Sequence, residues 1–223
     1  MVLIPKKDGA ESITDFRPIS LIHSFTKIIA KLLALRLAPH MSSIISTAQS
    51  AFIKRRSIHD NFMLVRNAAR RYHNSKLPTL FIKLDITKAF DSVRWEYLLN
   101  LLKKLGFPAR WRDWIAALLF TSSTRVLLNG IPNAPIKHGR GLRQGDPLSP
   151  LLFVIAMEPL QKLLHLATEK GYLSRLRGRT TQLRVSMYAD DTTIFIKPTR
   201  KDMLALADLL TCFGEASGLK TNF

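Results

Sequence analysis

Two adjacent carboxylates, Asp190 and Asp191, lie between two apolar segments of the sequence, within the stretch from Gln182 to Ile196. The pattern predicts two short strands interrupted at residues 188–191. Burying two like charges without a partner is costly, so a positive charge should balance them. A divalent cation does this well, because Mg²⁺ binds carboxylate oxygens together with water and substrate phosphates. For an Asp-Asp pair taken alone, the alternative is an ordinary polar turn.

A third carboxylate, Asp85, lies near the end of another expected strand. The segment from Leu80 to Ile86 is short, apolar and preceded by the breaker Leu77-Pro78, which favours a buried strand. Pairing this strand with those around residues 188–191 would bring three carboxylates together. Three carboxylates can hold two metal ions about 3.5–4 Å apart, an arrangement that activates an attacking oxygen and stabilises a leaving one in phosphoryl transfer.

A glycine-rich loop from His138 to Pro147 is the next candidate. Glycine has no side chain, so Gly141 and Gly145 suit places where the backbone approaches a nucleotide or template closely. A plain loop is the alternative interpretation. Phe90, taken alone, is typical of a core aromatic, and Asp91 is equally suited to capping a helix that starts at Ser92.

The composition indicates a packed, strongly basic protein. The 34 Lys and Arg residues against 16 Asp and Glu give a net charge of +18 over 223 residues. Such an excess indicates a polyanionic partner, the alternative being a basic surface that only aids solubility. The single cysteine, Cys212, cannot form an internal disulfide, and no Cys/His spacing resembles a zinc site.

Neither secretion nor membrane insertion is expected. The longest apolar run, Leu151 to Met157, is far shorter than the roughly 20 residues that a bilayer requires. In the first seven residues the apolar side chains precede Lys6 and Lys7, which is the wrong order for a signal peptide. This opening reads as a short strand, and a strand so close to the start predicts partners further upstream.

Helical periodicity and turn signals predict the remaining elements of one connected unit. Leu21, Phe25, Ile28, Leu32 and Leu35 predict a helix that ends before Pro39 and faces the core with this stripe. Ser57 is the expected N-cap of a second helix, with Ile58, Phe62, Val65, Ala69 and Tyr72 on one stripe and Arg66, Arg70 and Arg71 on the other face. Further helices are expected at 92–105, around 111–118, at 148–170 and at 201–217, with a β-hairpin at 124–137 around Asn129-Gly130.

The sequence Tyr188-Ala189-Asp190-Asp191 resembles the catalytic signature of reverse transcriptases. More narrowly, the chain resembles the non-LTR (LINE-type) retrotransposon enzymes, particularly those of plants. Five segments carry this resemblance in the family's order: residues 2–7 with 15–20, then 85–91, 141–150, 188–191 and 217–222. Group II intron enzymes share several of these motifs, so they remain an alternative family.

The resemblance implies an α+β right-hand polymerase fold, with palm and fingers, an antiparallel palm sheet backed by helices, and no thumb. Residues 1–75 would be mainly fingers and 76–223 mainly palm, with a fingers-like hairpin around 122–140, in one reverse transcriptase domain. The last motif, at 217–223, normally continues in this family toward a primer-gripping hairpin and a helical thumb, so the resemblance implies a chain truncated at its C-terminus.

The resemblance also assigns roles to individual residues. It implies that Asp85, Asp190 and Asp191 are catalytic and hold two Mg²⁺ ions, or Mn²⁺, with the Ile86 carbonyl as a further ligand. Phe90 would lie under the incoming sugar and exclude a 2′-hydroxyl. The implied nucleotide-binding residues are Arg17, Phe90, Gln144, Gly145 and Lys6, with Lys7 beside them, and Arg suits phosphate through its planar fork. The implied template and primer contacts are Tyr188, Gly141, Arg143, Lys54 and Arg55.

The function implied is that of an RNA-directed DNA polymerase, whose partners are an RNA template, a DNA primer and dNTPs. The chain would belong to a longer polyprotein and act inside the cell, in the nucleus. The alternative from another class is a catalytically silent, basic RNA-binding relic of a retroelement, which keeps the fold without turnover.

Overall fold

The computed structural model describes residues 2–12, 15–19, 22–128, 131–176 and 183–222, and it describes only the backbone of residues 2, 3, 17, 18, 128 and 222. In chain order the elements are β1 (Val2–Pro5), β2 (Phe16–Ile19), α1 (Ser24–Leu37), the 3₁₀ helix η2 (Ala38–His40), α2 (Met41–Ile44), α3 (Ile58–Asn74), β3 (Leu80–Ile86), α4 (Ala89–Ser92), α5 (Trp95–Lys104), α6 (Ala109–Phe120), β4 (Ser123–Thr124), β5 (Leu127–Leu128), β6 (Ile131–Pro132), β7 (Ile136–Lys137), α7 (Ser149–Glu169), β8 (Val185–Tyr188), β9 (Asp191–Ile196), α8 (Arg200–Ser217) and β10 (Thr221–Asn222). The chain is therefore a mixed α+β protein, as expected.

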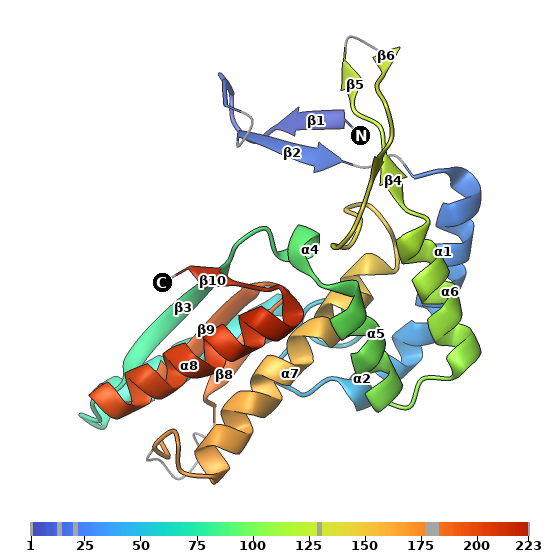
Figure 1. Cartoon of the computed structure of the whole chain (residues 1–223). Coiled ribbons are helices and arrows are strands. Elements are labelled where there is room, and N and C mark those ends of the chain that lie inside the picture. The colour runs from blue at the N-terminus through green and yellow to red at the C-terminus, as the bar shows by residue number, and fades with distance from the viewer. Residues whose placement is uncertain (1, 13–14, 20–21, 129–130, 177–182, 223) are drawn as a thin grey trace.

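The central sheet has four strands in the order β10-β3-β9-β8, and each neighbouring pair is antiparallel (Figure 1). Strand β3 alternates along its length, so that Leu84 and Ile86 are buried while Lys83 and Asp85 are exposed. The register pairs Leu84 with Thr192 and therefore directs the next residue, Asp85, toward the start of β9. The two sheet faces are thus an apolar face and a face that carries charge at one end.

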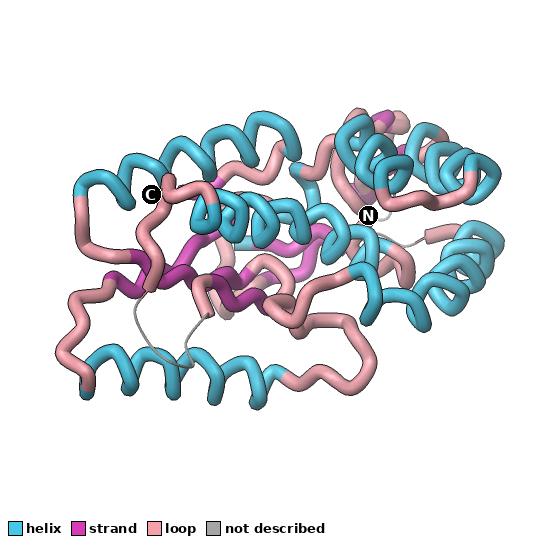
Figure 2. Tube along the Cα trace, turned by 90° about the horizontal axis from the view of Figure 1, so that it is seen from below, coloured by secondary structure: helices cyan, strands magenta, loops and turns pink. Residues whose placement is uncertain are grey.

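Helices cover both faces of this sheet (Figure 2). On the apolar face, α7 and α8 supply Phe153, Leu160 and Phe213 to a core that also contains Leu84 and Ile194. On the other face, α3 packs Tyr72 against Phe195, with ring centroids 5.4 Å apart. Helix α3 covers the Phe195 part of that face and leaves the charged end exposed.

Helix α7 is apolar on nearly all sides. Among the described residues it has the length and composition of a helix that could cross a membrane. Most of it is buried here, and residues 151–157 have no more than a few percent of their surface exposed. Burial in the core accounts for the apolar composition of this helix.

The prediction for the orientation of α1 is wrong. Four residues of the predicted core stripe are exposed, with Phe25 at 67%, Ile28 at 67%, Leu32 at 50% and Leu35 at 59% of their accessible surface, and the fifth, Leu21, lies outside the described residues. The buried side chains are instead Ala30, Leu33, Ala34 and Leu37. Both sets follow helical spacing, so the helix has two apolar faces and periodicity cannot choose between them. The face rich in alanine is buried, since small side chains allow close packing.

The prediction for α3 is correct at its start and wrong in part of its stripe. Ser57 is the N-cap, and its hydroxyl accepts a hydrogen bond from the His59 backbone N–H at 3.1 Å. Tyr72 is buried as expected, but Ile58 and Phe62 are more than half exposed. The first two turns of α3 contact β8 through the polar Asn61, which donates to the Met187 carbonyl and accepts from the Ser186 hydroxyl, while Ile58 and Phe62 remain exposed.

The expected helix at 92–105 is present as α5, and the short helix α4 precedes it. They are separated at Arg94, whose backbone N–H donates to the Ser217 carbonyl at 2.8 Å. The expected hairpin after α6 is present as the pairs β4–β7 and β5–β6, and its predicted turn at Asn129-Gly130 lies outside the described residues. A second hairpin, β1–β2, lies near the tip of the first (Figure 1).

Candidate active site

The turn between β8 and β9 presents two carboxylates to solvent. Tyr188 and Asp191 are the last paired residues, so Ala189 and Asp190 form a two-residue loop. Ala189 has a φ of 56°, the left-handed conformation that tight hairpin loops require. Asp190 and Asp191 are both exposed, whereas Tyr188 is half-buried. The hairpin geometry therefore sets where both carboxylates lie.

Asp85 lies on the neighbouring strand at the same end of the sheet. It is exposed, and its Cα pairs with that of Asn222 on β10. Two residues earlier, the Lys83 ammonium lies 3.0 Å from Oδ1 of Asp191. A hydrogen bond to Asp191 raises the pKa of Lys83, and the charges of Asp191, Asp85 and Asp190 add to this effect. The positive charge expected beside these carboxylates is thus supplied by Lys83, which lies on the same strand face as Asp85 but was not predicted.

The expected cluster of three metal-binding carboxylates is not formed as such. Among the described residues, no group of three His, Cys, Asp or Glu side chains is arranged to hold a metal ion. Asp191 forms an ion pair with Lys83. The donors still fit a hard divalent cation, because all three are exposed carboxylates at one end of one sheet. Ile86, whose carbonyl was the expected further ligand, is buried at the end of β3.

Phe90 on α4 joins the core and remains partly exposed. Its ring stacks on the buried ring of Phe153, with centroids 4.4 Å apart and planes 16° apart. Its carbonyl accepts a hydrogen bond from the Leu142 N–H at 2.7 Å. The glycine-rich loop is therefore attached directly to the helical turn that follows Asp85.

Gly141 packs tightly against another part of the backbone, which explains why a glycine is needed at this position. Its φ is 85°, and an added Cβ would lie 2.7 Å from the Asp91 carbonyl oxygen. Its N–H donates to Val93, and its carbonyl accepts from the Trp95 indole. The close approach at Gly141 in this structure is to the backbone of α4, and its contact with a nucleotide or template stays a prediction. Gly145 also has a positive φ of 97° and is exposed.

Gln144, in this loop, hydrogen-bonds to Asp91 near the end of α4. Burial raises the pKa of Asp91, while Lys88, His138 and a hydrogen bond from Gln144 oppose the increase. His138 reaches the hairpin, where its Nε2 lies 2.6 Å from Oγ1 of Thr124. The loop therefore connects α4 to the β4–β7 hairpin through side chains as well as backbone.

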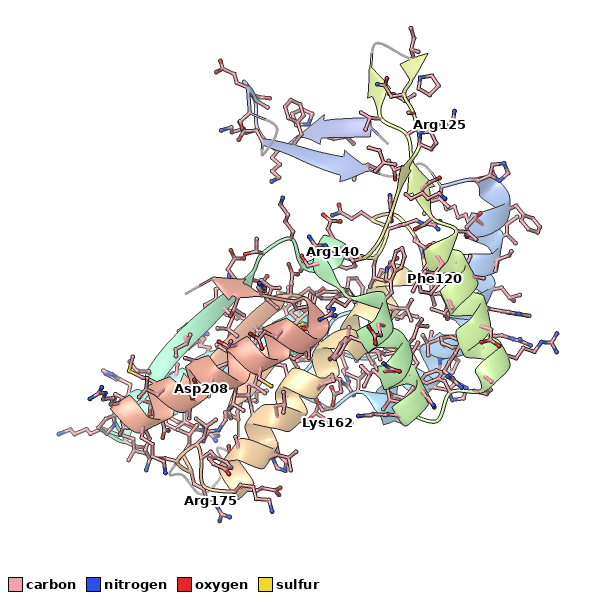
Figure 3. The ribbon with its side chains drawn as sticks, in the orientation of Figure 1. Phe120, Arg125, Arg140, Lys162, Arg175 and Asp208 are labelled. Atoms are coloured by element: carbon pink, nitrogen blue, oxygen red, sulfur yellow. The ribbon has the colours of Figure 1, made fainter. Side chains whose placement is uncertain are left out.

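Arg143 is anchored on α6. One of its terminal nitrogens donates to the Leu118 carbonyl at 2.5 Å, and burial lowers its pKa. Its predicted template contact remains a prediction. Two neighbouring cations, Arg140 in the loop and Arg125 on the hairpin, are exposed (Figure 3).

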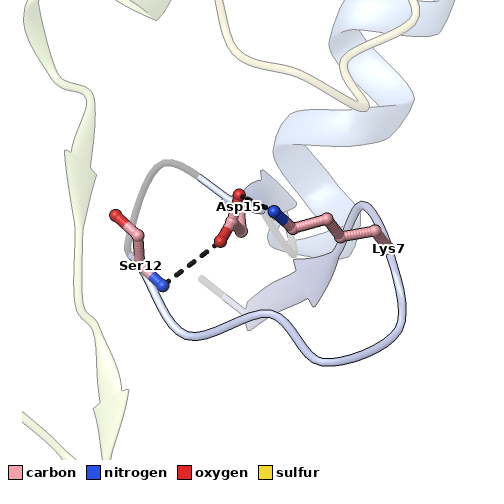
Figure 4. Close-up of polar contacts among 3 residues, drawn as sticks. All are labelled: Lys7, Ser12 and Asp15. Carbon is pink, nitrogen blue, oxygen red and sulfur yellow. Dashed lines mark hydrogen bonds and ion pairs between the residues drawn. The ribbon is translucent and has the colours of Figure 1, made fainter.

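In the N-terminal hairpin, one of the two lysines predicted to face phosphate, Lys7, forms an ion pair within the hairpin itself. The Lys7 ammonium lies 3.0 Å from Oδ1 of Asp15, whose other oxygen accepts from the Ser12 N–H at 3.3 Å (Figure 4). The hydrogen bond with Lys7 is the main reason that the pKa of Asp15 is lowered. Lys6 donates its backbone N–H to Asp15. Arg17 lies on β2 opposite Ile4, and its side chain is outside the part of the chain described.

The basic run at 54–56 divides into exposed and internal residues. Lys54 and Arg55 are exposed and remain candidates for nucleic-acid contact. The Arg56 guanidinium instead donates to the carbonyls of Ser46, Gln49 and Ile45 at 2.5, 2.6 and 3.0 Å. Sequence pattern does not distinguish these neighbours, because only the fold places backbone carbonyls around Arg56.

Comparison with known proteins gives a consistent result. The reverse transcriptase (RNA-dependent DNA polymerase) family profile matches residues 4–223. The chain is 32% identical over 223 residues to the transposon TX1 uncharacterized 149 kDa protein of Xenopus laevis. It is 31% identical over 220 residues to the Pol polyprotein of a type-1 R2 retrotransposable element from Nasonia vitripennis. These alignments cover 99% and 98% of this chain but only 17% and 20% of the two relatives.

Solved structures of telomerase share the fold. The telomerase of Candida tropicalis in complex with a TWJ fragment of telomeric RNA superposes with a TM-score of 0.58 at 15% identity, covering 90% of this chain and 32% of that one. The telomerase of Candida albicans with the same kind of RNA fragment gives a TM-score of 0.57 at 14% identity, over 89% and 33% of the two chains. The arrangement of sheet and helices is therefore that of a polymerase palm and fingers.

Proposed function

The chain belongs to the reverse transcriptase (RNA-dependent DNA polymerase) family, and from this membership we propose that it extends the 3′-hydroxyl of a DNA primer on an RNA template. The primer oxygen attacks the α-phosphorus of a dNTP, a new phosphodiester bond forms, and pyrophosphate leaves. The observation that carries this proposal is the joint position of Asp85, Asp190 and Asp191 at one exposed end of the antiparallel sheet. The catalytically silent RNA-binding relic would keep the fold without this reaction.

Reverse transcriptases generally use divalent metal ions. Here Asp85, Asp190 and Asp191 would hold two Mg²⁺ ions, or Mn²⁺, which when bound neutralise charge on the reacting phosphates. The chain's own contribution is to keep these carboxylates on two paired strands and a tight turn, so that their relative positions are fixed before substrate arrives. The Ile86 carbonyl would be a further ligand.

We assign the nucleotide and template contacts as follows. Phe90 would select against a 2′-hydroxyl, and the support for this role is that its ring stacks on Phe153 while the residue remains partly exposed. The residues that would bind the nucleotide are Gln144, Gly145, Arg17 and Lys6. The residues that would contact template or primer are Tyr188, Lys54, Arg55 and Arg143.

We place the fingers mainly in residues 1–75 and the palm mainly in 76–223, with the hairpin around 122–140 assisting the fingers. The chain spans 17–20% of the length of the retroelement relatives compared above, so we propose that it works within a longer polyprotein. A nuclear site of action is part of the same proposal, and imaging of a tagged chain would test it.

Primer extension tests the proposal. The wild-type chain should extend a labelled DNA primer annealed to an RNA template when dNTPs and Mg²⁺ are present. The Asp190→Asn variant should lose extension to below a few percent of wild type, because an amide is a poor Mg²⁺ ligand, while nucleic-acid binding is retained. The control is Asp208→Asn, on the exposed face of α8 and away from the turn (Figure 3).

Two results would contradict this assignment. Extension by Asp190→Asn at more than a few percent would remove Asp190 from the site. A wild-type chain that binds the primer–template but never extends it would favour the silent RNA-binding relic.

A further inference from the structure

A fully buried glutamine, Gln49, holds the backbone of the turn that carries Asp190. Its Oε1 accepts hydrogen bonds from the Ala189 N–H and the Ala51 N–H, both at 3.0 Å. Its Nε2 donates to the Ala189 carbonyl at 3.2 Å. The side-chain amide thereby satisfies both backbone groups of Ala189. Gln49 and Ala189 are 140 residues apart in the chain, so this contact exists only in the folded protein.

The segment around Gln49 also pairs with the strand that leads into the turn. The Met187 N–H donates to the Ala48 carbonyl at 2.7 Å, and the Ser50 N–H donates to the Met187 carbonyl at 3.0 Å. Asn61 on α3 adds a side-chain hydrogen bond to the Met187 carbonyl at 2.9 Å. Strand β8 would otherwise be the edge of the sheet, so this segment covers the edge next to the turn.

The residues between α2 and α3, here called the 45–57 segment, are themselves fixed to the core. Arg56 binds three of its carbonyls, as described above. At the same end as these carbonyls, Oε2 of Glu158 on α7 accepts from the Ser46 N–H at 3.2 Å and from the Ser46 hydroxyl at 3.1 Å. Gln49 thus reaches the turn from a rigid support.

Ala189 needs such support. A non-glycine residue at a φ of 56° adopts a conformation that is unfavourable by itself and persists when its surroundings fix it. Rotation of this residue would move Asp190, which follows it directly. A glutamine that engages both the N–H and the carbonyl of Ala189 limits such rotation.

We propose that Gln49 is a positioning residue for polymerase chemistry: it fixes the backbone at Ala189 and thereby the position of the Asp190 carboxylate. This inference rests on the proposed function, since it assumes that Asp190 holds a divalent ion. It assigns Gln49 no contact with substrate. Groups that orient a metal ligand from behind typically alter metal affinity or activity about 10- to 100-fold when they are removed.

The test compares Gln49→Met with Ser46→Ala. Methionine keeps the length of the side chain and removes all three hydrogen bonds, whereas Ser46→Ala removes one anchor of the same segment without touching the turn. Binding of Mn²⁺ followed by electron paramagnetic resonance reports the site without turnover, and Asp190→Asn defines the signal that belongs to it. Gln49→Met should weaken this binding about 10- to 100-fold and speed amide exchange at Ala189, while primer–template affinity and the Ser46→Ala variant stay near wild type.

The outcomes separate this inference from the proposed function. Unchanged Mn²⁺ affinity in Gln49→Met, with only a lower melting temperature, would show that Gln49 is merely structural. If Gln49→Met does not fold, Gln49→Glu takes its place, because it keeps the acceptor and replaces the donor that faces the Ala189 carbonyl. A wild-type Ala189 amide that exchanges without protection would also overturn the inference. Failure of the wild type to extend primers refutes the proposed function alone, since none of these measurements needs turnover.

Discussion

Lys83 places a positive charge among the three carboxylates of the candidate site. Its ammonium lies 3.0 Å from Asp191, and both side chains are about two-thirds exposed. An ion pair this exposed is weak, so it can be exchanged for a stronger cation at little cost. Lys83 therefore reduces repulsion between the carboxylates and also competes with any divalent ion that they bind.

We predict that Lys83→Met lowers the Mg²⁺ concentration needed for half-maximal primer extension by about two- to fivefold, the range expected for an exposed charge pair. The measurement is a Mg²⁺ titration at constant ionic strength. Lys162→Met is the control, because Lys162 is an exposed lysine on α7, away from the turn (Figure 3). A higher Mg²⁺ requirement in Lys83→Met would mean that the lysine assists the site instead of competing.

Phe90 stacks on one aromatic neighbour, Phe153, and remains partly exposed. We predict that Phe90→Val raises incorporation of ribonucleotides relative to deoxynucleotides about tenfold or more, because the smaller side chain leaves room for a 2′-hydroxyl. Single-nucleotide incorporation with paired rNTP and dNTP substrates measures this ratio.

The control for Phe90 is Phe120→Val. Phe120 also contacts one aromatic ring, that of Trp95 at 5.2 Å, but it lies at the end of α6 (Figure 3). Its substitution should leave the ratio unchanged. If Phe90→Val also leaves the ratio unchanged, Phe90 contributes only to the core.

Helix α1 shows how two apolar faces of one element differ in their contribution to stability. We predict that Leu33→Ala, at a fully buried position, lowers the free energy of unfolding by about 2–5 kcal/mol. Leu35→Ala, on the exposed face of the same helix, should change it by less than about 0.5 kcal/mol. Urea denaturation of both variants measures the difference, and equal losses would mean that the exposed face is packed in solution.

A glycine at the end of α8, Gly218, packs closely against the backbone that joins α4 to α5. Gly218 has a φ of 85°, and a Cβ there would lie 2.2 Å from the Ser92 carbonyl oxygen. We predict that Gly218→Ala costs more stability than Gly171→Ala, which has a similar φ of 77° but open space around it. The control should lose about 1–2 kcal/mol from backbone strain alone, and Gly218→Ala should exceed this because backbone must move as well. Calorimetric unfolding of both proteins would show whether the contact matters.

At the scale of the whole molecule, the net charge of +18 includes exposed basic residues on helix α3. Helix α3 lies on the same sheet face as Asp191, since Phe195, which it covers, is on that face. Its Arg66 and Arg70 are exposed. Helix α5, by contrast, packs with α7 on the opposite face. A nucleic acid that reaches the carboxylates therefore passes α3 more closely than α5.

We predict that the double variant Arg66→Gln, Arg70→Gln reduces the slope of log affinity against log salt concentration by about 1–2, because each released phosphate contact contributes about 0.9. Fluorescence anisotropy of a labelled primer–template at several salt concentrations measures this slope. The matched control, Lys103→Gln with Lys104→Gln on α5, should leave it unchanged. If the α5 variant reduces the salt slope more than the α3 variant does, the nucleic acid lies on the face of the sheet that α5 and α7 cover.

Much of the site could be predicted from local sequence. The strand at 80–86 and the break at 188–191 depend on residues close together in the chain and were predicted from them, whereas the polymerase fold followed from the resemblance of the motifs to reverse transcriptases. Local hydrogen bonding and alternation of apolar residues encode these features directly. The same reasoning predicted Ser57 as a helix cap, because capping is also a local interaction.

The tertiary structure decided what depends on distant partners. Periodicity gave α1 two possible core faces, and packing against the rest of the domain selected the one with Ala30 and Leu33. Gly141 packs against the backbone of Asp91, and Lys83 forms an ion pair with Asp191. Both contacts exist because the fold brings these residues together. The contacts of Gln49 with Ala189 join residues 140 positions apart, so its proposed role follows only from the folded structure. Residue type and spacing thus determined the chemistry available to this protein, while long-range packing determined which side chains hold that chemistry in place.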